Sequence, residues 1–235
     1  PKPLISLGGV ALFELVLWNL RSTMLSKIVL ITRQEHNLKS REIDLSLKLG
    51  TQVEIIEVSE TTEGPASSVL IGLESVDLAE PVVVANSDQF VAFDYQPFYE
   101  ALLAKNSPGT LLTLKDKDPK WSFIETDGQG NFKAIHEKRP ISDVATVGIY
   151  GFRTGKILRH AIKAMMASDA RTNGEFYVGP AYNFFEKDAH LIKWSDVGAP
   201  GQIFFGLGTP VDLLNSLSVP AFFDSVIQAR DFWLQ

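Results

Sequence analysis

The chain has 235 residues, enough to bury a substantial core as one large domain or two small ones. It contains no cysteine, which excludes disulfides, thiolate catalysis and zinc–thiolate sites and suits a reducing cytoplasm. A net charge of -6 argues against a general nucleic-acid binder. The sequence also contains no export signal and no run of roughly 20 apolar residues that would span a membrane.

The first half of the chain alternates between predicted helices and predicted strands. Helices are expected at 11–20, 42–49, 65–73 and 95–104, and strands at 27–32, 53–58, 81–85 and 110–114. Short apolar runs rich in β-branched residues are typical of buried strands. Alternation at this spacing predicts an α/β fold with a mostly parallel, mixed, Rossmann-like sheet and helices on both faces.

The second half begins near residue 115 and changes character. A β-hairpin is expected, with strands at 121–126 and 132–135 joined by the turn Asp127-Gly128-Gln129-Gly130. Beyond it we expect strands at 145–152 and 191–194, and helices at 156–167, 176–186 and 210–217. The apolar stretch 219–234 predicts a last helix, either packed on the domain or available to a partner subunit.

One strand runs directly into polar residues. The apolar run Pro81–Ala85, interpreted as a central parallel strand covered on both faces, is followed by Asn86, Ser87 and Asp88. Ligands of α/β sheets bind beyond the carboxyl ends of the strands. Asp88 is therefore either a capping residue of a helix or turn, or a residue that binds a ligand or takes part in catalysis at this end of the sheet.

Six segments at wide spacing form an ordered set. They are Pro1–Ile5, Thr62–Ala66, Asn86–Gln89, Glu137–Pro140, Val147–Phe152 and Gly208–Leu214. In this order they resemble the sugar-phosphate nucleotidyltransferases, also called nucleotide-sugar pyrophosphorylases. The Asn-Ser-Asp-Gln motif is most similar to the capsule-biosynthesis branch. The resemblance extends from Pro1 to about Leu217.

The resemblance implies a single GT-A-like nucleotidyltransferase domain over residues 1–235. Residues 1–114 would bind the nucleotide. Residues 115–217, which include the β-hairpin, would bind the acceptor, and residues 218–235 would form the C-terminal helix. In the implied reaction, the phosphate of a small phosphorylated acceptor, such as a sugar 1-phosphate, attacks the α-phosphorus of an NTP and releases pyrophosphate. Crowded phosphates of this kind require positive charge and alignment more than covalent catalysis.

Residue roles follow from the same resemblance. Asp88 would hold Mg²⁺, a hard cation that takes one or two carboxylates plus substrate oxygens. Lys2 would contact the NTP phosphates, and this role requires Lys2 and Asp88 to lie at the same end of the sheet. The other nucleotide-binding candidates are Glu63, Gly64, Pro65, Asn86 and Ser87.

The acceptor-binding candidates are Glu137, Lys138, Gly148 and Glu175. By the resemblance, Glu137 meets sugar hydroxyls, Lys138 the acceptor phosphate, and Gly148 gives a backbone contact. Each position also has a structural alternative. Glu137 and Lys138 fit surface charges after a hairpin, Gly148 a small residue in a packed strand, and Glu175 a carboxylate in the first turn of a helix.

Two features depart from the family pattern. The family carries a Gly-x-Gly-x-Arg phosphate loop ahead of Pro-Lys-Pro-Leu, and we expect that loop to precede Pro1 in the natural protein. Many members also place an aspartate, a second metal ligand, where this chain has Gly206. That leaves Asp88 as the one identified carboxylate, with Glu175 as a further candidate ligand.

Several functions stay open at this point. The first is a cytoplasmic, Mg²⁺-dependent enzyme that makes nucleotide sugars for capsule or other surface polysaccharides. The sequence is also compatible with a homo-oligomer of this enzyme. The second is a cytidylyltransferase acting on a non-sugar phosphate such as phosphocholine. The third is a non-catalytic, nucleotide-sugar-binding regulatory domain, favoured by Gly206. A glycosyltransferase is disfavoured because no Asp-x-Asp motif follows a strand.

Overall fold

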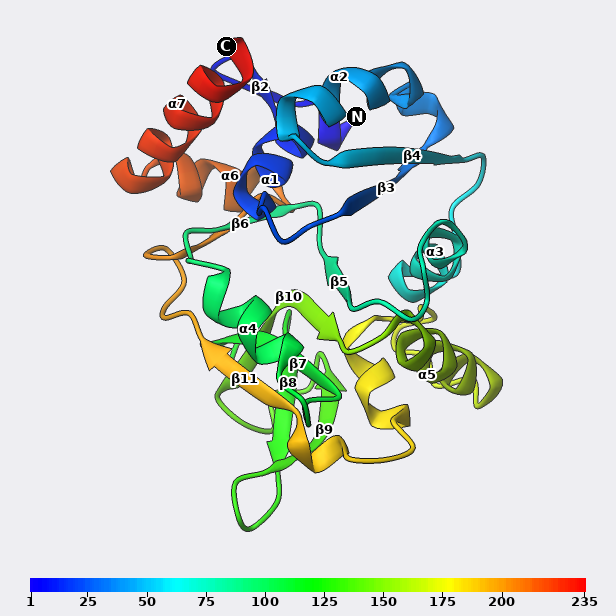
Figure 1. Ribbon diagram of the computed structural model, residues 1–235. Helices are drawn as coiled ribbons and strands as arrows, with labels where there is room; N and C mark the ends of the chain where they lie inside the picture. Colours follow the sequence, from blue (N-terminus) through cyan, green and yellow to red (C-terminus); the bar gives the residue numbers. More distant parts are fainter. The chain divides into compact units, whose positions relative to one another are not determined.

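The computed structural model describes all 235 residues, which form two compact units. Unit 1 consists of Pro1–Glu57, Asn86–Tyr95 and Val197–Gln235, and unit 2 of Val58–Ala85 and Gln96–Asp196. Figure 1 follows the chain through both units by colour. None of the helices is both long and apolar enough to cross a bilayer.

Unit 1 combines short strands with four α-helices. Its elements are β1 (Ser6–Leu7), β2 (Val10–Ala11), α1 (Leu12–Leu20), β3 (Lys27–Arg33), α2 (Glu42–Leu49), β4 (Gln52–Val58), β6 (Gln89–Val91), β12 (Phe204–Gly206), α6 (Pro210–Leu217) and α7 (Pro220–Leu234), with 3-10 turns at Lys2–Leu4, Gln34–His36 and Lys39–Arg41. The pairs are β1 with β2, β3 with β4, and β6 with β12. These elements confirm the predicted helices and strands of this part of the chain within a few residues.

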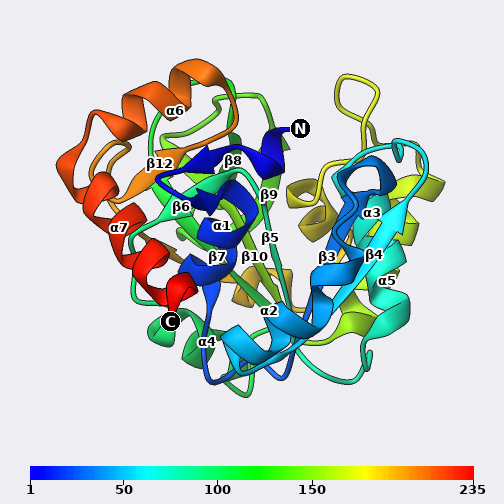
Figure 2. The same cartoon turned by 90° about the horizontal axis from the view of Figure 1, so that it is seen from above.

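The core of unit 1 is aromatic. Phe90, on β6, lies 5.6 Å from Phe222, on α7, between ring centroids, and Phe222 lies 5.0 Å from Phe205 on β12. All three side chains are buried. Figure 2 shows α1 beside α7 and β6, and the C-terminal helix is thus packed into its own unit.

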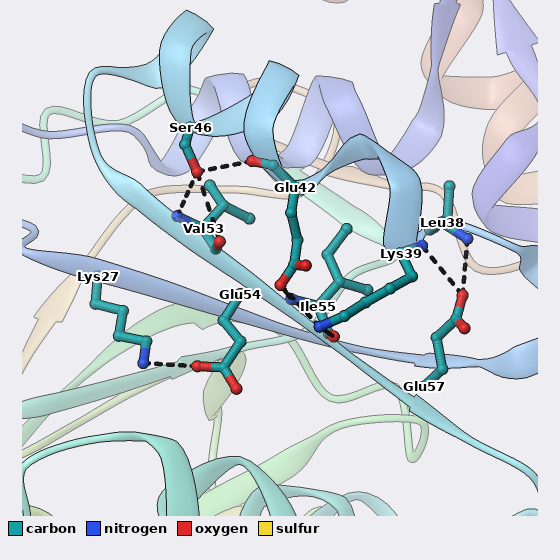
Figure 3. Close-up of polar contacts among 9 residues, drawn as sticks. All are labelled: Lys27, Leu38, Lys39, Glu42, Ser46, Val53, Glu54, Ile55 and Glu57. Carbon is teal, nitrogen blue, oxygen red and sulfur yellow. Dashed lines mark hydrogen bonds and ion pairs between the residues drawn. The ribbon is translucent and has the colours of Figure 1, made fainter.

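One edge of β4 is closed by side chains rather than by another strand. The backbone N–H of Ile55 donates to Glu42 Oε1 at 2.8 Å, and its carbonyl accepts from Lys39 Nζ at 2.7 Å (Figure 3). Two residues earlier, the N–H of Val53 donates to Ser46 Oγ at 2.9 Å. Since an unpaired strand edge is a template for further pairing, helix α2 and the turn before it protect this edge.

Unit 2 is built on a six-stranded mixed sheet in the order β11-β7-β10-β8-β9, with β5 also paired to β10. Its elements are α3 (Pro65–Gly72), β5 (Val82–Ala85), α4 (Gln96–Leu103), β7 (Gly109–Lys115), β8 (Ser122–Thr126), β9 (Phe132–Glu137), β10 (Val144–Phe152), α5 (Gly155–Ala167) and β11 (Lys193–Asp196), with 3-10 turns at Leu73–Ser75, Gly179–Phe184 and Ala189–Leu191. Strand β11 runs parallel to β7, whereas β10 runs antiparallel to β5, β7 and β8. Strands β5, β7 and β11 therefore share one direction.

Helices cover both faces of this sheet. Phe152 belongs to the buried cluster that includes Leu158 and Ile162 of α5. Its neighbour Gly151 faces the opposite way, where an added Cβ would lie 3.1 Å from Phe98 of α4. Because successive strand residues point to opposite faces, α5 and α4 lie on opposite sides of β10 (Figure 1). The α/β class and the mixed sheet are confirmed.

Two local predictions were wrong. Strand β5 is half-buried throughout rather than fully covered, and its partner β10 is antiparallel to it. The helix predicted at 176–186 is a 3-10 turn over Gly179–Phe184. There the Tyr182 hydroxyl donates to the Gly151 carbonyl at 2.8 Å, and the Asn183 side chain bonds the backbone of Ile135 at 2.7 and 2.8 Å. Tertiary hydrogen bonds fix this segment on the sheet and override its helical pattern.

Candidate functional site

Lys2 and Asp88 form an ion pair in unit 1. The Lys2 ammonium lies 2.8 Å from Asp88 Oδ2, although 86 residues separate the two in sequence. Both side chains are partly open to solvent, at 45% and 36% exposure, so incoming phosphates have access to them. Asn86 and Ser87 precede Asp88 in the bend between β5 and β6, and Ser87 is exposed there.

Glycine residues from the end of β12 complete the surroundings of Asp88. The Asp88 carbonyl accepts a hydrogen bond from Leu207 N at 2.8 Å, which holds the segment after β12 beside the Asn-Ser-Asp bend. A Cβ on Gly208 would lie 3.2 Å from Asp88 Oδ2. Glycine at 208 therefore keeps the carboxylate uncrowded. At Gly206, by contrast, an added Cβ would meet Asp212, whose backbone and carboxylate are bonded to Thr209 at the start of α6.

The donor set in unit 1 fits a metal ion that is shared with substrate. Asp88 offers a hard, partly exposed carboxylate, with one oxygen in contact with Lys2. No group of three or more histidine, aspartate or glutamate side chains converges anywhere in the chain. Mg²⁺ commonly binds through one or two carboxylates together with waters and substrate phosphates. Asp88 fits that mode of binding and not an all-protein cage.

The predicted nucleotide segment lies in unit 2, at the start of α3. Gly64 has φ 126° and ψ 174°, and Pro65 opens the helix. A Cβ on Gly64 would lie 2.6 Å from the backbone nitrogen of Phe176 and 2.7 Å from its carbonyl oxygen. Position 64 therefore requires glycine, because its backbone lies directly against the backbone of Phe176. Glu63 is exposed beside it.

Glu175 is presented by a tight turn. Thr172 and Glu175 exchange two backbone hydrogen bonds of 3.0 Å, with Asn173 at φ 50° and Gly174 at φ 83° between them. Two central residues with positive φ are typical of a type I′ turn, for which Asn-Gly is the preferred sequence. The turn leaves the Glu175 side chain exposed, and Phe176 buried directly after it.

Lys138 and Glu175 are joined through Tyr177. The Lys138 ammonium donates to the Tyr177 hydroxyl at 2.6 Å, and that hydroxyl donates to Glu175 Oε2 at 2.7 Å. The hydrogen bond that Lys138 donates to Tyr177 raises the pKa of Lys138, which keeps the ammonium charged. Lys138 also has φ 56°, a left-handed backbone that is uncommon outside glycine and that accumulates at functional sites. An ammonium, a hydroxyl and a carboxylate in a row are suited to a ligand that carries both phosphate and hydroxyl groups.

Glu137, next to Lys138, is buried rather than exposed as a surface charge. The Ser122 hydroxyl donates a hydrogen bond to the Glu137 carboxylate, and burial raises the pKa of Glu137. Gly148 lies in β10, where the register against β7 shifts between Thr146 and Tyr150. With φ 70° and a buried position, Gly148 forms the irregular point of that strand.

The candidates are divided between the two units. Unit 1 holds Lys2, Asn86, Ser87 and Asp88, and unit 2 holds Glu63, Gly64, Pro65, Glu137, Lys138, Gly148 and Glu175. Their roles toward substrates stay predictions. Sequence reasoning missed Tyr177 and Arg171. The position of Tyr177 two residues after Glu175, hence near it in an extended segment, was the available signal.

A buried mixed sheet with helices on both faces, carrying such polar groups at its loops, defines an α/β protein suited to phosphorylated ligands. A family model described as nucleotidyl transferase matches residues 1–205. The chain belongs to this family and is a nucleotidyltransferase, which confirms the resemblance at the level of the superfamily. This membership favours the enzyme over a non-catalytic regulatory domain.

Several solved structures are similar over almost the whole chain. The nucleoside-diphosphate-sugar pyrophosphorylase from Vibrio cholerae RC9 is 25% identical with a TM-score of 0.77, and the match covers 93% of this chain and 91% of that one. A putative glucose-1-phosphate thymidylyltransferase from Bacillus anthracis is 18% identical with a TM-score of 0.73, covering 98% and 87%. The inositol-1-phosphate CTP transferase from T. maritima is 14% identical with a TM-score of 0.70, covering 98% and 88%. Among curated protein sequences, none matches this one.

Proposed function

We propose that this protein joins an NTP and a sugar 1-phosphate to give a nucleotide sugar and pyrophosphate, in the cytoplasm, for capsule or other surface polysaccharides. The observation that carries the proposal is the contact between Lys2 and Asp88, the two motif residues to which a phosphate role and a metal role are assigned. The similarity to a nucleoside-diphosphate-sugar pyrophosphorylase supports the sugar acceptor.

In the proposed reaction an oxygen of the acceptor phosphate attacks the α-phosphorus of the NTP. A new P–O bond forms as the bond from the α-phosphorus to the bridging oxygen breaks, and pyrophosphate leaves with the electron pair. Lys2 neutralises charge on the NTP phosphates, and Asp88 orients that ammonium through their 2.8 Å contact. Mg²⁺ held by Asp88 would supply further charge neutralisation on the phosphate oxygens.

The acceptor is proposed to bind at Lys138, Tyr177 and Glu175. The Lys138 ammonium, charged at neutral pH, has three donors, so it pairs with the acceptor phosphate while the Tyr177 hydroxyl keeps it in position. Glu175 then accepts hydrogen bonds from acceptor hydroxyls, as does the Glu137 carboxyl through the oxygen that Ser122 does not bind. Gly64 and its neighbours contact the nucleobase.

A pyrophosphate-release assay tests this function. Five common NTPs are crossed with a panel of sugar 1-phosphates, using the full natural chain. Asp88→Asn should lower turnover at least about 100-fold, a loss of roughly 2.7 kcal/mol of transition-state stabilisation, while the circular dichroism spectrum stays unchanged. Asp224→Asn, at an exposed position on α7 of the same unit, is the matched control and should keep wild-type turnover. Full activity of Asp88→Asn would contradict the proposed role.

A non-sugar acceptor is the second candidate, because the inositol-1-phosphate CTP transferase shares the fold with a TM-score of 0.70. The same assay decides between them. The panel therefore includes inositol 1-phosphate and phosphocholine with CTP. Turnover with these acceptors and with no sugar 1-phosphate would replace the leading proposal.

A further inference from the structure

Arg171 connects two segments that lie far apart in the sequence of unit 2. Its guanidinium forms an ion pair with Glu63, in the predicted nucleotide segment, 108 residues away. It also donates to the Gly174 carbonyl at 3.2 Å, within the turn that presents Glu175. A third group, the Asp169 carboxylate, accepts a hydrogen bond from Arg171 Nε at 2.6 Å and fixes the plane of the guanidinium.

The same guanidinium stacks on an aromatic ring. Arg171 Cζ lies 4.0 Å from the centroid of Phe176, a residue that is 1% exposed. Exposed ion pairs by themselves stabilise little, because solvent screens them and the side chains lose entropy. A planar cation that is stacked and bonded on several sides is pre-organised, and this geometry cannot be reproduced by lysine.

The two segments also meet through their backbones. Phe176 N donates to the Glu63 carbonyl at 2.9 Å, and Ala66 N donates to the Phe176 carbonyl at 2.9 Å. Gly64 lies between these bonds with no room for a Cβ. Any displacement of the turn that carries Glu175 therefore displaces the Glu63–Gly64 backbone as well.

We propose, on the basis of the function proposed above, that Arg171 is a positioning residue that couples nucleotide binding to acceptor binding. It clamps the Glu63–Ala66 segment to the Thr172–Phe176 turn, so a nucleotide that orders the first segment pre-orders the second. Coupling between two ligands is reciprocal, and each substrate therefore tightens the binding of the other. Arg171 itself contacts neither reacting phosphate.

A binding experiment measures the coupling directly. The α,β-methylene analogues of CTP, GTP, ATP, UTP and dTTP are titrated by calorimetry, each with and without the sugar 1-phosphate that the wild-type protein turns over. In the wild-type protein the acceptor should tighten binding of the matching analogue about fivefold or more. In Arg171→Ala this ratio should fall by at least about half, because only the two backbone hydrogen bonds still join the segments. Arg171→Lys should recover only part of the lost coupling.

Hydrogen exchange supplies a second readout that needs no substrate. In Arg171→Ala, amides of both segments, 62–66 and 172–177, should exchange faster together, while α5 stays protected. Arg159→Ala, on α5 of the same unit, is the matched control and should change neither readout. A wild-type coupling ratio in Arg171→Ala, or faster exchange confined to one segment, would overturn the coupling while leaving the proposed function intact. A wild-type protein that turns over no NTP would overturn the proposed function, and the coupling with it.

Discussion

Gly64→Ala gives the most direct test of how the nucleotide segment is built. At φ 126° and ψ 174°, Gly64 occupies a backbone region that is essentially restricted to glycine. Forcing alanine into it costs about 1–3 kcal/mol, and contacts of 2.6 and 2.7 Å with the Phe176 backbone add an overpacking cost of about 1–3 kcal/mol. The two together predict a destabilisation of roughly 2–6 kcal/mol, a large part of the 5–15 kcal/mol that is typical of whole proteins.

Two glycines of the hairpin turn in the same unit separate these contributions. Gly130 has φ 82°, and a Cβ added there would meet no atom within 4 Å, so Gly130→Ala should cost about 1–2 kcal/mol from backbone strain alone. Gly128 also has open space and no such φ, and Gly128→Ala should stay within about 0.5 kcal/mol of the wild type.

Urea unfolding followed by circular dichroism and tryptophan fluorescence measures the three variants. The expected order of destabilisation is Gly64→Ala, then Gly130→Ala, then Gly128→Ala. The Michaelis constant for NTP should also rise in Gly64→Ala, because the segment must move away from Phe176. A Gly64→Ala protein as stable as Gly130→Ala would refute the claim that the Phe176 backbone requires glycine at this position.

Three further variants test individual side chains. Lys2→Met should raise the Michaelis constant for NTP about tenfold with little change in melting temperature, since an exposed ion pair contributes about 0–1 kcal/mol; an unchanged constant contradicts the phosphate role. Tyr177→Phe should raise the Michaelis constant for the acceptor about fivefold, which corresponds to roughly 1 kcal/mol. The Michaelis constant for NTP should change by less than about twofold. Equal effects on the two Michaelis constants would refute the assignment of Tyr177 to the acceptor site. Burial raises the pKa of Glu137, so its contribution to stability is present below the usual carboxyl pKa and is lost as pH rises through the raised value. Glu137→Gln cannot ionise, so its stability relative to the wild type should increase as pH rises from the usual carboxyl pKa through the raised pKa of Glu137. A difference in stability that stays constant with pH would count against the buried carboxyl.

The sequence predicted most elements because local pattern and final environment agree. Helix α5 has an N-cap threonine, Thr154, whose hydroxyl accepts from Ile157 N at 3.2 Å, and the hairpin of β8 and β9 has its glycines at the turn. The segment around Tyr182 could not be predicted from periodicity, because its conformation is set by hydrogen bonds to strands distant in sequence. Strand direction was equally inaccessible at β5, since an apolar run of valines fits either pairing.

Site residues that belong to a sequence motif could be predicted. Site residues whose role depends on contacts with side chains distant in sequence were harder to predict. Asp88 and Lys2 were named from their motifs and lie in contact. Glu137 fitted a surface charge equally well, because nothing local indicates that Ser122 and burial would enclose it. Arg171 carries no motif, and its importance appears only when Glu63 and Phe176 are seen on either side of it.

The division of the chain between its units has a practical consequence for dissecting the enzyme. The backbone passes from one unit to the other four times, after Glu57, Ala85, Tyr95 and Asp196. No terminal deletion therefore yields unit 1 alone, and removal of both ends leaves unit 2 with the Asn86–Tyr95 segment of unit 1 inserted in it. A single protease cut at any of these passages divides unit 1 between two fragments. The core of unit 1 should hold these fragments together, so the nicked protein should co-elute as a single species until denaturant is added.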